Sequence, residues 1–152
     1  MRFVAIGLLF LSGQPFLPMD RSNAAAGRRN FDPARAEELI GYARSIVLSP
    51  SQQQMRDRVL DGISAPCCAK FSARTCCCAC NLAKTIWGLS NVLIVREGAG
   101  PAALEKAVRG WLAALNPKGF SGKACDEAGG CARKFSRDGC GGMDERNLVA
   151  AR

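Results

Sequence analysis

The chain contains no histidine in 152 residues, and this absence excludes several kinds of site. A Ser-His-Asp triad, a His-assisted thiol and the C-x-x-C-H attachment of a c-type haem all require histidine. Soft metal ions would have to be bound mainly by cysteine thiolates, with methionine sulfur as the other soft donor. The sequence therefore points to sulfur chemistry without naming a reaction.

Aromatic residues are also scarce, at 7% of the chain, and they are not interleaved with the basic residues. The basic residues are mostly single, and the short clusters are Arg28-Arg29 and Arg133-Lys134. Nucleic-acid binding needs a dense basic surface and usually stacking aromatics. We therefore expect no nucleic-acid partner, and a net charge of +8 that favours solubility and weak attraction to an anionic cell surface.

Long hydrophobic runs are missing as well. The apolar stretch at residues 3–11 follows Arg2 and is far shorter than the ~20 residues of a membrane span. Ala24-Ala25-Ala26 then offers the small-x-small pattern of a cleavage site, so residues 1–26 are predicted to be an export signal peptide. We expect an extracytoplasmic protein, periplasmic or secreted, with no transmembrane segment in the mature chain. Outside the cytosol disulfides persist, and export as an unfolded chain would exclude a preassembled iron–sulfur cluster.

Apolar residues recur at helical spacing in four segments, and no segment shows a convincing strand pattern. Asp32-Pro33, the capping-box pair Ser49 and Gln52, and Pro101 indicate helix starts. The sequence predicts a mostly α, small four-helix domain over residues 27–143, in which the third helix is central and most buried. The helices are expected over residues 33–48, over 50–61, from within the cysteine cluster to about 96, and from 101 to a stop at 116–117.

The segment after Pro117 has a different character. Seven glycines and three cysteines, Cys125, Cys131 and Cys140, fall within residues 118–143. So many glycines disfavour regular structure, which predicts an irregular C-terminal flap held by its cysteines. Residues 144–152 are expected to form a flexible tail.

Six of the nine cysteines lie within fourteen residues and form the cysteine cluster. Zn²⁺ takes four ligands in a tetrahedron and Cu⁺ is satisfied by two or three thiolates. If the third helix began at Cys76, Cys76 and Cys80 would share one of its faces. The spacing does not match the paired C-x-x-C arms of a zinc ribbon. The candidate metal ligands are Cys76, Cys77, Cys78 and Cys80, with Cys67 and Cys68 completing the set.

Structural disulfides are the default expectation for an exported cysteine-rich domain. Adjacent cysteines rarely bond to each other because the small ring is strained. The disulfide candidates in the flap, Cys125, Cys131 and Cys140, could each bond to a clustered cysteine, and an odd total of nine leaves one thiol over.

A third possibility is thiol–disulfide exchange through Cys77-x-x-Cys80, with Lys70 and Arg74 lowering a thiol pKa. The chain lacks the strand–helix alternation of a thioredoxin-like domain, and no motif for acyl, phosphoryl or glycosyl transfer is present. Enzymatic activity is therefore not favoured. Among active roles the sequence favours soft-metal handling or buffering with Cu(I) or Zn. The alternative is a disulfide-stapled helical module whose surface meets a protein partner.

Overall fold

The computed structural model describes residues 33–66, 68–76 and 79–115. Four α-helices lie in this part of the chain, and its paired extended backbone is limited to one isolated bridge between Ser64 and Ser72. The prediction of a mostly α, four-helix protein is confirmed. The helices are α1 (Pro33–Ser45), α2 (Pro50–Asp61), α3 (Asn81–Glu97) and α4 (Pro101–Leu115). The predicted export signal, the C-terminal flap with its three cysteines, and the tail lie outside the described residues.

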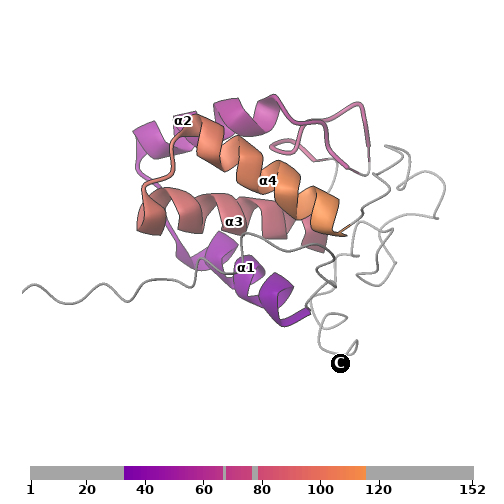
Figure 1. Ribbon diagram of the computed structural model, residues 1–152, viewed down its shortest axis with the longest axis horizontal. Helices are drawn as coiled ribbons and strands as arrows, with labels where there is room; N and C mark the ends of the chain where they lie inside the picture. Colours follow the sequence, from indigo (N-terminus) through magenta and orange to yellow (C-terminus); the bar gives the residue numbers. More distant parts are fainter. Residues whose placement is uncertain (1–32, 67, 77–78, 116–152) are drawn as a thin grey trace, which may run out of the picture.

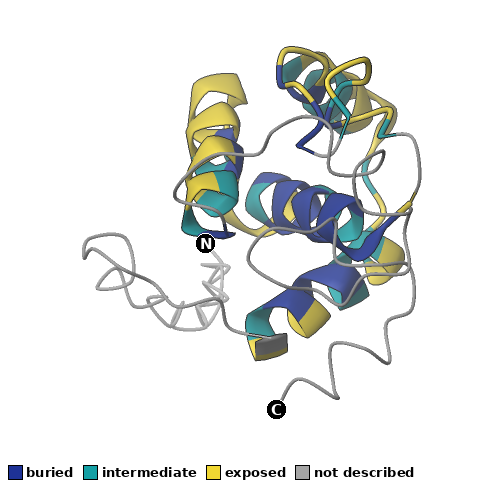
Figure 2. Ribbon diagram, turned by 90° about the vertical axis from the view of Figure 1, so that its right-hand side faces the viewer, coloured by how far each residue is buried: buried dark blue, intermediate teal, exposed yellow. Residues whose placement is uncertain are grey.

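Helix α3 is the centre of the arrangement, as the sequence predicts. It contacts each of the other three helices, whereas α1 contacts α3 alone among the described helices (Figure 1). Burial is concentrated in the middle of the bundle (Figure 2). Eleven residues of α3 are buried, including Leu82, Ile86 and Leu89 of the predicted apolar stripe. The largest fully buried side chains of the other helices are Leu39, Ile40, Leu60, Leu104 and Val108.

The contact between α1 and α3 is close because a glycine lies at the crossing. A Cβ built on Gly88 would lie 1.7 Å from the carbonyl oxygen of Leu39 and 3.0 Å from the amide nitrogen of Ala43. Both atoms belong to the α1 backbone, so no side-chain rotation could relieve the overlap. Glycine lets two helix backbones approach to a distance that any other residue would prevent.

Helix α1 ends at Ser45, three residues earlier than the sequence predicts. One further helical bond, from the amide of Ile46 to the carbonyl of Tyr42 at 3.1 Å, continues beyond it. Ser49 must then be extended, because it precedes Pro50 and serves as the N-cap of α2. The chain therefore has to leave the helical conformation before Ser49, a constraint that the apolar periodicity alone does not reveal.

A buried amide on α3 joins this break to α2. The Asn91 side chain is 3% exposed, donates to the carbonyl of Ile46 at 3.2 Å and accepts from Nη1 of Arg56 at 3.1 Å. Arg56 also donates from Nη2 to Asp57 at 2.8 Å. One side chain thus satisfies a carbonyl at the end of α1 and orients a half-buried arginine of α2.

We expect Asn91→Ala to lower the free energy of unfolding by about 2 kcal/mol, because the Ile46 carbonyl and the Arg56 guanidinium both lose a bond in a partly buried place. Urea denaturation followed by circular dichroism measures this loss. Gln53→Ala, on the exposed face of α2, is the control and should change stability by less than about 0.5 kcal/mol. Equal stabilities of the two variants would contradict the bridging role of Asn91.

The helix starts largely follow the predicted capping signals. Ser49 accepts from the amide of Gln52 at 3.4 Å, and the Gln52 side chain accepts from the amide of Ser49 at 2.9 Å, which completes the predicted capping box. Pro101 opens α4, and α3 ends at Gly98, whose φ of 63° lies in the left-handed region that suits glycine.

Both tryptophans pack against the core, as their places on apolar helix faces predict. The indole N–H of Trp111 donates to Oγ1 of Thr85 at 3.0 Å, and that of Trp87 donates to the carbonyl of Ala73 at 3.0 Å. The bond of Trp87 joins α3 to the segment that carries the cysteines.

Candidate metal-binding loop

The cysteine cluster lies in the connection between α2 and α3, residues 62–80, which we call the cysteine loop. Its first half folds back on itself as a short hairpin. The amide of Ala73 donates to the carbonyl of Ile63 at 2.7 Å, and the amide of Ala65 donates to the carbonyl of Phe71 at 2.8 Å. A turn closed by the bond from Phe71 to the carbonyl of Cys68, at 3.0 Å, lies at the tip. The hairpin therefore places Cys68 in its turn.

The described cysteines occupy three positions along the loop. Cys68 is half-buried and carries a free thiol, Cys76 is half-buried after the hairpin, and Cys80 is buried at the N-cap of α3. No disulfide joins two of these three. The other candidate ligands, Cys67, Cys77 and Cys78, lie outside the described residues. The metal site of six cysteines and the disulfides between the cluster and the flap therefore stay predictions. Within the described part of the chain, no three cysteine or carboxylate side chains come together as a metal site.

The helical arrangement expected for the cluster is wrong. Helix α3 begins at Asn81, and Cys76, Ala79 and Cys80 are not helical, so Cys76 and Cys80 do not share a helix face. Cys80 is extended, with φ −69° and ψ 166°, and its carbonyl accepts from the amide of Lys84 at 3.0 Å. These are the features of an N-cap residue. The cysteine cluster therefore precedes the central helix and ends where that helix begins.

The cysteine loop is attached to the helices at its first residue and within the hairpin. The indole N–H of Trp87 on α3 donates to the carbonyl of Ala73 at 3.0 Å, and Nη2 of Arg109 on α4 donates to the carbonyl of Gly62 at 3.3 Å. Ala65 and Ala73 are buried against the helices at 2% and 1% exposure. The described residues of the hairpin are thus attached to the helices by hydrogen bonds and by burial.

An ion pair ties the hairpin to the last residue of α2. Nε of Arg74 lies 2.8 Å from both carboxylate oxygens of Asp61, and the hydroxyl of Ser72 donates to Oδ1 of Asp61 at 2.9 Å. The hydrogen bond from Arg74, and then that from Ser72, holds the pKa of Asp61 below its ordinary value of 3.8. Because this pKa is lowered, the carboxylate stays ionised to a lower pH than a free aspartate, and the pair is lost only as the pH falls through the lowered pKa, below 3.8.

This ion pair was not predicted from the sequence. The sequence interpretation gave Arg74 the role of lowering a thiol pKa, but its guanidinium is paired with Asp61, which raises the pKa of Arg74. One signal was available: an aspartate at the C-terminal end of a helix faces the negative end of the helix dipole, so such a residue needs a cation nearby. Asp61 is the last residue of α2.

The sequence in the cysteine loop and through most of α3 contains positively charged but no negatively charged residues. Residues 62–96 contain no aspartate or glutamate, while Lys70, Arg74, Lys84 and Arg96 are spaced through them. Carboxylate oxygens, the ligands of hard ions such as Ca²⁺ and Mg²⁺, are therefore absent from this stretch. Its donor chemistry is that of thiolates, which suits soft ions.

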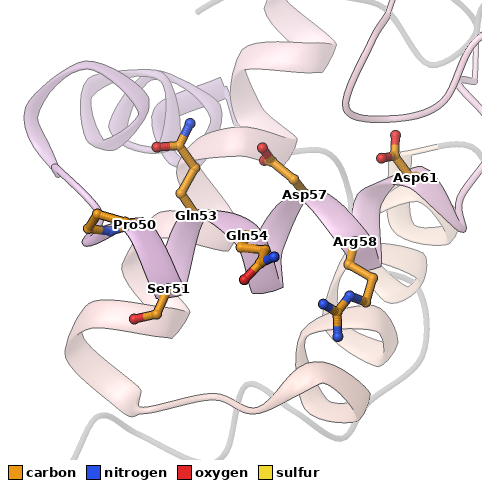
Figure 3. Close-up of a pocket in the computed structure, with 7 residues that line it drawn as sticks. All are labelled: Pro50, Ser51, Gln53, Gln54, Asp57, Arg58 and Asp61. Atoms are coloured by element: carbon orange, nitrogen blue, oxygen red, sulfur yellow. The ribbon is translucent and has the colours of Figure 1, made fainter.

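A shallow depression lies on α2. Its lining residues all belong to that one helix and project to different sides of it (Figure 3). They are Pro50, Ser51, Gln53, Gln54, Asp57, Arg58 and Asp61. Most are exposed and all come from α2, so this face lacks the enclosure typical of a small-molecule site.

No helix of the described ranges has the length and hydropathy needed to cross a bilayer. Comparisons with protein-family models, curated proteins and solved structures find no match to this chain.

Proposed function

We propose that this chain is an exported protein that binds a soft metal ion, Cu⁺ or Zn²⁺, through thiolates of the cysteine loop and acts in metal handling or buffering. The first candidates are Cys76, Cys77, Cys78 and Cys80, with Cys67 and Cys68 completing the set. The support is chemical: six thiols fall within one short loop that has no histidine and no carboxylate.

The observation that carries the proposal is the place of Cys80. It is 0% exposed and lies at the N-cap of the most buried helix. The positive end of the α3 dipole at this position favours a thiolate or an anionic metal–thiolate group.

The test is the intact native mass of the full chain recovered from an oxidising compartment, with a thiol count after unfolding. Export predicts a mass that lacks residues 1–26. Soft-metal binding predicts that copper or zinc is bound and that four or more thiols are reduced. Eight oxidised cysteines, one thiol and no metal would contradict metal binding and favour the disulfide-stapled module. One thiol reacting far faster than all others, without metal, would instead indicate an oxidoreductase.

A further inference from the structure

We propose that the bond between Asp61 and Gly62 is a site of isoaspartate formation, and that hydrogen bonds from the side chains of Arg74 and Ser72 to the Asp61 carboxylate keep this reaction slow in the folded chain. Asp61 is the last residue of α2 (Figure 3). The inference does not depend on metal binding. It gives the ion pair at this junction a chemical role, which is to protect the backbone where α2 meets the cysteine loop.

The reaction needs no reagent other than water. The amide nitrogen of Gly62 bonds to Cγ of Asp61, and the amide proton leaves with a carboxyl hydroxyl as one water molecule. Water then opens the five-membered ring. Opening at Cγ restores aspartate, whereas opening at the main-chain carbonyl carbon gives isoaspartate, in which the backbone runs through Cβ and Cγ. Glycine favours the first step, because it has no Cβ to hinder attack by its own nitrogen.

The Asp61 carboxylate is held in the form that reacts poorly. Nε of Arg74 lies 2.8 Å from both carboxylate oxygens, and the hydroxyl of Ser72 donates to Oδ1 at 2.9 Å. Loss of a hydroxyl requires a protonated carboxyl group, and these hydrogen bonds lower the pKa of Asp61. The neutral form is therefore rarer than in a free aspartate at the same pH. Ring closure also brings Cγ to bonding distance of the Gly62 nitrogen, a movement that the hydrogen bonds resist.

The backbone around the reacting bond is held as well. The amide of Gly62 donates to the carbonyl of Val59 at 3.1 Å, and the carbonyl of Gly62 accepts from Nη2 of Arg109 at 3.3 Å. Attack requires that the Gly62 amide lose its bond and that Asp61 leave the helical conformation. The rate then depends on how often this end of α2 opens locally, and the ion pair with Arg74 opposes that opening.

The sequence around the site allows the product to be measured without ambiguity. Trypsin cleaves after Arg58 and Lys70, and the peptide of residues 59–70 contains one aspartate, Asp61, and no asparagine. Any isoaspartate found in this peptide therefore comes from residue 61. Isoaspartate has the same mass as aspartate, so the two forms are separated by chromatography and identified by electron-transfer fragmentation.

The experiment stores the full chain and its variants in a mildly acidic, reducing buffer and follows the isoaspartate fraction with time. A synthetic peptide of residues 59–70 gives the rate without the fold. We expect the unmodified chain to react more slowly than the peptide, and Arg74→Gln to react about two- to fivefold faster than the unmodified chain, the size expected for an exposed ion pair. Ser72→Ala removes one hydrogen bond and keeps the ion pair, so its increase should be smaller.

Arg35→Gln is the matched control. It removes the ion pair with Glu38 on α1, a helix that contacts α3 alone among the described helices, and should leave the rate unchanged. Gly62→Ala, added to Arg74→Gln, should remove most of the increase because the new methyl group hinders the attack. Alanine fits at this position, since φ is −78° and a Cβ would lie 3.4 Å from the carbonyl oxygen of Val59.

The outcomes decide the inference whether or not the chain binds metal. Equal rates in the unmodified chain and Arg74→Gln would overturn the protective role of the ion pair. An equal increase in Arg35→Gln would overturn it too, because the rate would then follow general stability. If the synthetic peptide forms no isoaspartate, the bond is not such a site. Circular dichroism establishes that each variant is folded, and if Arg74→Gln is not, an unchanged rate in Ser72→Ala rules against the proposal.

Discussion

Replacing Gly88 by alanine is expected to destabilise the fold by about 3 kcal/mol. The new Cβ would lie 1.7 Å from the Leu39 carbonyl oxygen and 2.6 Å from its carbon, so α1 and α3 would have to move apart. Alanine favours a helix interior over glycine by roughly 0.5–1 kcal/mol, which offsets only a small part of this loss. Guanidinium denaturation of the full chain, followed by circular dichroism, measures the change.

Gly110→Ala is the matched control. Gly110 is exposed in α4, and a Cβ there would meet nothing within 4 Å. The same substitution should stabilise the chain at this site by about 0.5–1 kcal/mol, since only the helix preference changes. Opposite signs at the two glycines would support the close crossing, whereas a stabilising effect at both would show that α1 and α3 do not approach as described.

The second large effect is expected for the double substitution Cys78→Ser with Cys80→Ser. If the cysteine loop binds a soft ion, loss of two thiolates should abolish stoichiometric binding of Zn²⁺ or Cu⁺ to the full chain, because hydroxyls are poor ligands for both ions. The helices should remain. Cys80 is the N-cap of α3, and serine is a preferred residue at that position. Metal stoichiometry by native mass and helicity by circular dichroism measure the two effects.

The control replaces two cysteines of the predicted flap, Cys125→Ser with Cys131→Ser, and should leave metal stoichiometry unchanged. The disulfide-stapled alternative predicts a different pattern. In that case the loop variant would lower the free energy of unfolding by a few kcal/mol with or without added metal, because a structural crosslink would be lost. Loss of stability without any change in metal content would therefore rule against a metal-binding loop.

Much of the helical architecture follows from local sequence signals. Pro33, Pro50 and Pro101 begin three of the helices, and Gly98 lies just after α3. Proline has a helix-compatible φ and lacks the amide that would stay unbonded in the first turn, while glycine accepts the left-handed conformation after the last. These preferences act within a few residues, so they can be read before the fold is known.

Two helix boundaries differ from those that periodicity predicts, at the end of α1 and at the start of α3. Periodicity predicts α1 to residue 48, but the chain leaves the helix after Ser45, and Asn91, far along the sequence, binds the Ile46 carbonyl. The four-residue spacing of Cys76 and Cys80 would place them on one face of a helix, yet α3 begins at Asn81, five residues after Cys76. Alternative local conformations differ by small free energies, so tertiary contacts choose between them.

The sequence by itself determined the four helices of the described residues, the central place of α3 and the concentration of sulfur donors in the cysteine loop, because apolar spacing, capping residues and donor atoms are properties of nearby side chains. Only the tertiary structure revealed the α1–α3 crossing at Gly88, the Asn91 bridge and the Asp61–Arg74 ion pair. Each of these joins residues that are distant along the chain. Such contacts depend on how the helices are packed in space, and no local pattern encodes that arrangement.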